Sequence, residues 1–101
     1  MENKITNPHP GIILKEEFLN ELDMSQNKLA KEIGVPGNRI HAIINGTRSI
    51  TADTDLRLSK FFGLSEGYWL RLQNAYDLME AKRITEISYR DIKPFEYENR
   101  A

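Results

Sequence analysis

Residues 25–51 read SQNKLAKEIGVPGNRIHAIINGTRSIT, and this stretch decides the fold. Ser25 is a favoured N-cap residue, and the apolar residues that follow it recur at helical spacing. Those residues are Leu29, Ala30 and Ile33. Gly34 stands where a helix end and a tight turn need a residue that tolerates positive φ. The pattern therefore predicts one helix from about Ser25 to Gly34.

A second short helix is predicted between Pro36 and the pair Asn45-Gly46, which ends it. Its apolar stripe consists of Ile40, Ile43 and Ile44. Such a narrow stripe anchors the helix and leaves the opposite face open to the major groove of DNA. Two helices joined by a glycine turn in this way are typical of a helix-turn-helix unit. The alternative is two ordinary packed helices, a common arrangement without a DNA-binding role.

The open face of this second helix carries the candidate base-reading residues. They are Asn38, Arg39, His41 and Ala42, with Arg39 at the flank. The side chains of Asn and Arg offer donors and acceptors that match the edges of adenine and guanine. His41 is expected to face the groove or a phosphate, because no metal-ligand partner stands at a recognised spacing from it.

A second set of residues is predicted to hold the DNA backbone. Gly46 lets the main chain approach a phosphate closely, and a hydroxyl and a guanidinium follow it directly in the sequence. Gln26 lies at the start of the preceding helix, where the helix dipole favours a phosphate. The full set is Gln26, Lys28, Asn45, Gly46, Thr47 and Arg48.

The distribution of charge agrees with this placement, although the whole chain carries a net charge of −1. Residues 24–48 hold four basic side chains and one acidic side chain, a net charge of +3. Residues 1–23 hold two basic and five acidic side chains, a net charge of −3. Positive charge is thus concentrated where the motif places DNA. A local excess of this size also arises by chance in short windows.

Three further helices are predicted from apolar spacing and from their end signals. One covers about residues 11–22, after Pro10. Its inward stripe would be Leu14, Phe18 and Leu22. Thr51 and Ser65 are expected to cap the other two helices, which would run to Gly63 and to about Ala81.

The expected fold is therefore all-α, with five helices and a short C-terminal extension. Residues 1–10 form an N-terminal arm, residues 11–82 form the helix-turn-helix domain, and residues 83–101 form a tail that is extended or loosely docked. Pro94 prevents a helix from continuing through the tail, and Ile87–Tyr89 could form a short extended piece.

The last of the five helices is apolar on more than one side, so its own small domain cannot bury all of it. Trp69 is expected to pack in the core, whereas three other residues would form a homodimer seam. These three are Leu70, Leu78 and Met79. A dimer would present two reading helices about 34 Å apart, the spacing of successive turns of the major groove.

Several classes of function are disfavoured by what the sequence lacks. The chain has no cysteine, which removes disulfides, thiolate metal sites and thiol nucleophiles. It has no phosphate-binding glycine loop and no HExxH motif, so neither an enzyme nor a bound cofactor is expected. Its carboxylate pairs, including Asp53 and Asp55, are interpreted as solvated helix faces, and His9 as a turn residue. No apolar run approaches the ~20 residues of a spanning helix, so a soluble cytoplasmic protein is expected.

Three segments together resemble the HigA-type antitoxins, also called VapI-like, of bacterial toxin–antitoxin modules. The segments are NPHPGIILKEEFL from Asn7, LAKEIGVPGNRIHAIINGTRSITADTDLRLSKFFG from Leu29, and a Ser-x-x-Tyr-Trp-Leu-x-Leu-Gln-x-x-Tyr-Asp-Leu run from Ser65. They occur in the family's order and spacing and cover about residues 7–83. The resemblance implies a lambda-repressor-like helix-turn-helix fold.

The same resemblance implies a homodimer that binds a palindromic double-stranded operator ahead of its own operon. It also implies that the protein neutralises a cognate toxin, a small basic ribonuclease that cleaves mRNA. The family places base-facing side chains at Asn38, Arg39 and Ala42. It places backbone contacts at Gln26, Asn45, Thr47 and Arg48.

Two departures from the family pattern affect these expectations. Asp55 and Ser59 stand where alanine is expected, so that face of the fourth helix would be more exposed or paired differently. Gly37 removes a possible base contact and leaves more of the readout to Asn38 and Arg39.

Two other functions fit the same sequence. One is a free-standing repressor without a toxin, which the absence of a neighbouring gene for a small basic protein would favour. The other is an interaction protein with incidental DNA affinity, whose acidic first helix and mixed tail attract a basic ribonuclease. Capture of such a neighbour without binding to upstream DNA would favour the latter.

Overall fold

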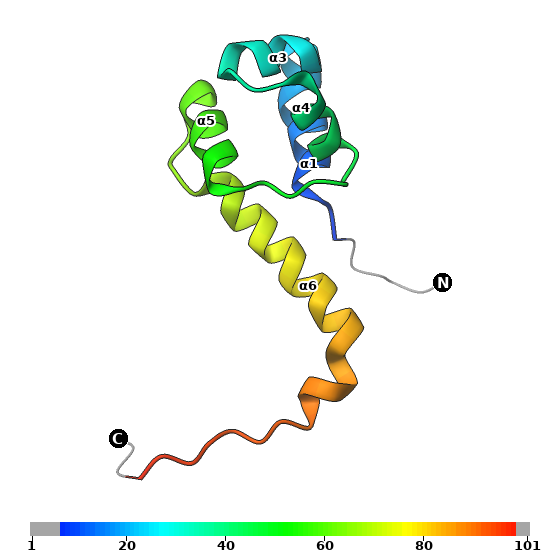
Figure 1. The fold of residues 1–101 in the computed structure, drawn as a ribbon, viewed down its shortest axis with the longest axis vertical. Coiled ribbons are helices and arrows are strands. Elements are labelled where there is room, and N and C mark those ends of the chain that lie inside the picture. Colours follow the sequence, from blue (N-terminus) through cyan, green and yellow to red (C-terminus); the bar gives the residue numbers. More distant parts are fainter. Residues whose placement is uncertain (1–6, 99–101) are drawn as a thin grey trace.

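The computed structural model describes residues 7–98, except for the side chains of residues 85–88. The first helix is continuous and consists of α1 (Pro10–Ile13), η1 (Leu14–Leu19) and α2 (Asn20–Leu22). The helices that follow are α3 (Gln26–Ile33), α4 (Gly37–Ile44), α5 (Ala52–Phe62) and α6 (Tyr68–Arg90). Within the described residues the chain is all-helical, and the predicted fold class of five helices is confirmed (Figure 1).

The first helix contains one wide turn that changes which residues face the core. In η1 the hydrogen bonds join residues five apart, as in the bond from the N–H of Asn20 to the carbonyl of Lys15. Leu14 and Leu19 therefore share one face, and both are buried. Leu22 is 55% exposed, so the prediction of an inward stripe ending at Leu22 was wrong. The prediction assumed a helical period that this turn does not keep.

The ends of α3 and α5 follow the predicted signals. The hydroxyl of Ser25 accepts the N–H of Lys28 at 3.0 Å, and Gly34 takes a left-handed conformation with φ of 72°. The hydroxyl of Thr51 accepts the N–H of Thr54, and Gly63 ends α5. Short polar side chains thus satisfy amide groups that a helix leaves unpaired at its start.

The core lies where the first helix, α3, α4 and α5 meet the start of α6 (Figure 1). Its largest fully buried side chain is Trp69, as predicted. The other core residues are Leu14, Leu19, Leu29, Ala30, Ile33, Val35, Ile40, Ile43, Ile50 and Leu58. Gly11 brings the first helix against α4, because a Cβ at this position would overlap the carbonyl of Ile43.

The start of α6 is capped by Asp55, a residue of α5. One carboxylate oxygen of Asp55 accepts the N–H of Gly67 at 2.7 Å, and the other accepts those of Trp69 and Leu70 at 2.7 and 3.2 Å. The predicted cap, Ser65, does not fill this role, because the helix begins later, at Tyr68. Asp55 and Ser59 are both buried, so of the two expectations for this face, pairing is correct and greater exposure is wrong.

The long helix α6 continues beyond the end predicted for it, near Ala81, and reaches Arg90. Residues 87–89 are therefore helical, which contradicts the alternative of a short extended piece. From Ile92 to Glu98 the described chain is exposed and without helix, at the end of α6 opposite the core (Figure 1). Among the residues described, no helix is long and apolar enough to cross a membrane.

Candidate nucleic-acid interface

The helices α3 and α4 form a compact unit joined by the turn at Gly34. Val35 is buried after this turn, and its N–H donates to the carbonyl of Ala30 at 3.0 Å. Ile40 and Ile43 anchor α4 in the core, as the apolar stripe predicted. The opposite face of α4 consequently points to solvent, which is the requirement for a helix that enters a groove.

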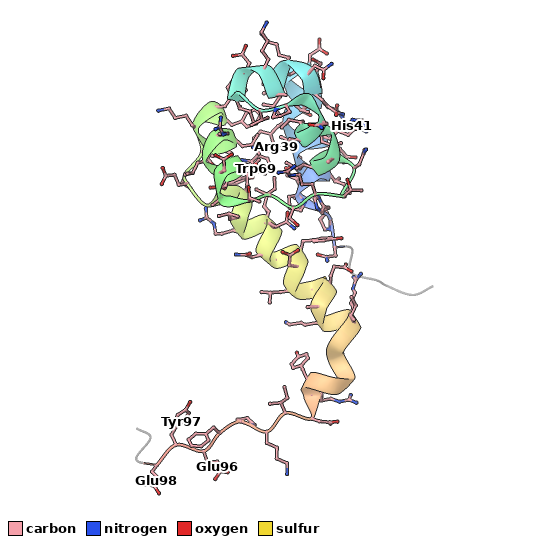
Figure 2. The ribbon with its side chains drawn as sticks, viewed as in Figure 1. Arg39, His41, Trp69, Glu96, Tyr97 and Glu98 are labelled. Carbon is pink, nitrogen blue, oxygen red and sulfur yellow. The ribbon has the colours of Figure 1, made fainter. Side chains whose placement is uncertain are left out.

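The open face of α4 is continuous with the start of α3. Asn38 and His41 are exposed, and Ala42 is half-buried. The Nδ1 atom of His41 lies 3.1 Å from the side-chain oxygen of Gln26. This contact joins a predicted base reader to a predicted phosphate contact, so the two positions form one surface. Figure 2 shows His41 on α4.

Arg39 differs from its neighbours on α4, because its guanidinium is held by another helix. Its Nη1 donates to Asp53 at the start of α5, at 3.0 Å. Only 24% of the Arg39 side chain is exposed. Within the described part of the chain, its Nε is buried without a hydrogen-bond partner. Arg39, which the sequence predicts as a base reader at this flank, is therefore paired with α5 in the structure.

Asp53 belongs to a network that the sequence prediction missed. The Nε of Arg57 donates to both carboxylate oxygens of Asp53 at 3.1 Å, and its Nη1 donates to the carbonyl of Ile33 at 2.8 Å. Hydrogen bonds and charge from Arg57, with a further contribution from Arg39, lower the pKa of Asp53. The spacing of Asp53 and Arg57 at i, i+4 on a helix was the signal that could have indicated the pair.

The loop after α4 carries most of the predicted backbone contacts. Asn45, Gly46, Thr47 and Arg48 are all exposed. The Thr47 hydroxyl donates to the carbonyl of Ala42 at 3.2 Å, which keeps the loop close to α4. Lys28, on α3, pairs with Glu32 at 3.2 Å and remains 60% exposed.

Two buried polar side chains, Gln73 and His9, lie close to this loop. Gln73 of α6 accepts the N–H of Ile50 at 2.8 Å, which fixes the end of the loop to α6. His9 is buried near Gly46, and its Nδ1 accepts the N–H of Gly11 at 3.0 Å. The interpretation of His9 as a simple turn residue was incomplete, because the imidazole caps the first helix.

The assembled surface has the chemistry of a DNA-binding face. It combines amide and imidazole groups on α4 with a positively charged loop and a helix start. A group of three or more potential metal ligands is absent from the described residues. The fold and this face define a helix-turn-helix protein.

Comparison with known proteins places the chain within that class. A family model described as "Helix-turn-helix" matches residues 14–69. The virulence-associated protein I of Dichelobacter nodosus is 44% identical over 82 residues, 81% of this chain and 76% of that protein.

Solved structures give the same result. An addiction module antidote protein of the HigA family from Coxiella burnetii is 47% identical, with a TM-score of 0.84 over 90% of this chain and 100% of that one. The Pseudomonas aeruginosa antitoxin HigA, solved with the higBA promoter, is 34% identical, with a TM-score of 0.85 over 90% and 100% of the two chains. The chain belongs to the HigA-type antitoxins of the helix-turn-helix family.

Proposed function

We propose that this protein is an antitoxin that binds the operator of its own operon as a homodimer and neutralises a cognate ribonuclease toxin. The observation that carries the DNA-binding part is the exposed face of α4, which continues through the contact between His41 and Gln26 to the start of α3. The relative from Pseudomonas aeruginosa with the same fold was solved with promoter DNA. A protein with this function would work in the cytoplasm.

Base reading is assigned to α4. Asn38 offers a donor and an acceptor, the pair of groups that match an adenine edge. His41 and Ala42 lie further along the same face, where they would meet the adjacent bases or the thymine methyl. Arg39 would contribute a guanine contact once its guanidinium leaves Asp53.

Contacts to the DNA backbone are assigned to both sides of α4. On one side Gln26 and Lys28 would meet one strand near the start of α3, where the helix dipole favours a phosphate. On the other side of α4, the loop Asn45–Arg48 would contact a second stretch of the DNA backbone. Gly46, with φ of 80°, leaves the main chain of this loop uncovered for close approach.

The dimer and the toxin are the further parts of the proposal. Leu78 of α6 is 63% exposed, which is consistent with a seam between two copies. Leu70 packs against the core of its own chain and Met79 is half-buried, so both would add only their remaining surface to the seam. A basic toxin would be attracted to the acidic first helix, where Glu16 and Glu17 are exposed.

The DNA-binding proposal can be tested with a duplex that the protein itself selects from a random library. Asn38→Ala should weaken binding to this duplex by about tenfold or more and leave binding to random DNA nearly unchanged. Arg48→Ala should weaken both alike and reduce the slope of log affinity against log salt by about one unit. Arg90→Ala, at the far end of α6, is the control. Equal losses on both duplexes for Asn38→Ala would refute base reading by Asn38.

A further inference from the structure

Exposed apolar side chains are concentrated at the C-terminal end of the molecule. Of the ten large apolar side chains that are exposed in the described part of the chain, six lie between residues 78 and 97. Three of them are on α6 and three are on the terminal segment, by which we mean residues 92–98. They are Leu78, Ile84 and Tyr89, and then Ile92, Phe95 and Tyr97. A concentration of this kind marks a contact with another protein chain.

The terminal segment has an extended backbone and leaves its own helix. The N–H of Ile92 donates to the carbonyl of Tyr89 at 3.0 Å, which closes the last turn of α6. Pro94 fixes its own φ and restricts the residue before it to extended conformations. Phe95 and Tyr97 pack edge-on against each other, with ring centroids 4.8 Å apart. Figure 1 shows that the segment leads away from α6, so this aromatic pair does not cover the helix of its own chain.

We propose that the terminal segment of each copy packs along α6 of the other copy and completes the homodimer interface. This inference rests on the proposed function, in which the protein is a homodimer with a seam at Leu78. It adds a second contact to that seam and makes the exposed part of α6 the surface that the segment covers.

The three residues predicted for the seam are too few to hold a stable dimer. Specific interfaces bury about 800 Å² on each partner and involve about 20–30 residues a side. Leu70 packs against the core of its own chain, and Met79 is half-buried. Each terminal segment would bring three exposed apolar side chains to the interface, those of Ile92, Phe95 and Tyr97. Because a dimer has two such segments, this contribution is made twice.

The terminal segment matches the exposed part of α6 in length and in charge. Residues 78–90 span ~20 Å as a helix, and seven extended residues span ~23 Å. Leu78 and Lys82 lie one turn apart on the same side of α6, and both are exposed. Glu96 and Glu98 alternate with the two aromatic residues. The rings would therefore cover Leu78 of the other copy, while the carboxylates meet its lysine.

A second copy fits this surface because the surface is self-complementary. Each chain offers one uncovered helix and one uncovered segment, so a two-fold dimer covers both helices and both segments at once. A toxin that bound the segment would leave the apolar side of α6 in need of another partner. The toxin is therefore the competing occupant that the experiment has to separate.

The first test measures self-association of the full chain alone by sedimentation over a range of concentrations. Phe95→Ser should weaken the dimer by at least tenfold, because two rings per dimer return to water. Removal of residues 93–101 should weaken it further and keeps the hydrogen bond of Ile92 to the end of α6. Lys93→Ser is the matched control in the same segment and should change the dimer by less than about twofold. An unchanged urea transition of Trp69 fluorescence would show that the core is intact in each variant.

The second test identifies which chain the segment contacts. The protein contains no cysteine, so single sites can be introduced without interference. In a mixture of Glu96→Cys chains and Lys82→Cys chains, a short bis-maleimide reagent should join the unlike chains. Replacing the second partner by Lys60→Cys, an exposed lysine on α5, is the control and should give no such product.

The outcomes separate this inference from the proposed function. If Leu78→Glu weakens the dimer but Phe95→Ser and the truncation do not, the dimer stands and the role of the segment is overturned. If the truncated chain dimerises normally but loses its toxin, the segment serves the toxin and the inference is wrong. Cross-links that form only within a chain carrying both cysteines would also overturn it. A wild-type protein that stays monomeric at every concentration would refute the proposed homodimer, and the inference with it.

Discussion

His9 shows how one side chain can connect the fold to the pH of the solution. Its neutral imidazole accepts the N–H of Gly11 and lies edge-on to the ring of Tyr76, with centroids 4.9 Å apart. Burial lowers the pKa of His9, and the nearby Asp77 opposes this shift only in part. Protonation of Nδ1 would place an N–H opposite the N–H of Gly11. The imidazole could then no longer accept this hydrogen bond, and the cap would be lost.

The stability of the protein should therefore fall as the solution is acidified below the ordinary histidine pKa of about 6.5. Below that pH the unfolded chain binds a proton at His9 more readily than the folded chain does. The expected result is a decrease in the free energy of unfolding between pH 7 and pH 5.5, measured by urea denaturation. The decrease should continue until the pH passes the lowered pKa of the folded state.

The control for this effect is His9→Asn, which retains a capping side chain and cannot titrate. The variant should lose less stability than the wild type over the same pH interval. An identical dependence on pH in the two proteins would contradict the role assigned to His9.

At the level of the elements, the junction between α5 and α6 depends on the buried carboxylate of Asp55. Asp55→Ala would remove the acceptor of three backbone N–H groups, of which that of Trp69 is buried and those of Gly67 and Leu70 are part-buried. The expected loss is about 2–3 kcal/mol of unfolding free energy. Urea denaturation followed by the fluorescence of Trp69 would measure it. Glu66→Gln, on the exposed connection to α6, should change stability by less than about 0.5 kcal/mol.

The sequence predicted elements whose signals are local and missed features that depend on distant contacts. Ser25, Gly34 and Thr51 act within one turn of their own helix, so their roles could be inferred directly. The cap of α6 could not, because Asp55 lies on a different helix. The wide turn in the first helix was missed for a different reason. An apolar residue that is followed by other apolar residues both four and five positions later fits an α turn and a π turn equally well.

The same distinction applies to the candidate interface. The exposure of Asn38 and His41 follows from the periodicity of the isoleucines on α4, and the sequence predicted it. The pairing of Arg39 with Asp53 depends on how α4 meets the start of α5. That geometry is a property of the packed core and is not visible in a helical pattern.

At the scale of the whole molecule, α6 extends well beyond the core and exposes apolar side chains along its length. Leu78 and Ile84 are 63% and 79% exposed, and only Leu78 was predicted as part of a seam. Covering such residues with a second copy would remove apolar surface from water. The long helix could thereby set the separation of two reading helices.

Leu78→Glu should therefore weaken self-association by roughly 30-fold, the equivalent of about 2 kcal/mol. Light scattering over a range of concentrations would report the change as a shift toward the mass of a monomer. Phe61→Glu, which alters an exposed apolar residue on α5, should leave the mass unchanged. Equal effects of the two substitutions would argue against a seam on α6.

The wide turn in the first helix has a consequence for how this architecture tolerates changes in chain length. A π turn is an α turn that has accommodated one additional residue. Deletion of one residue between Leu14 and Leu19 could restore ordinary α winding while both ends of the helix stay in place. Insertions and deletions are usually confined to loops. In this helix, however, a related chain that is one residue shorter could keep the same fold.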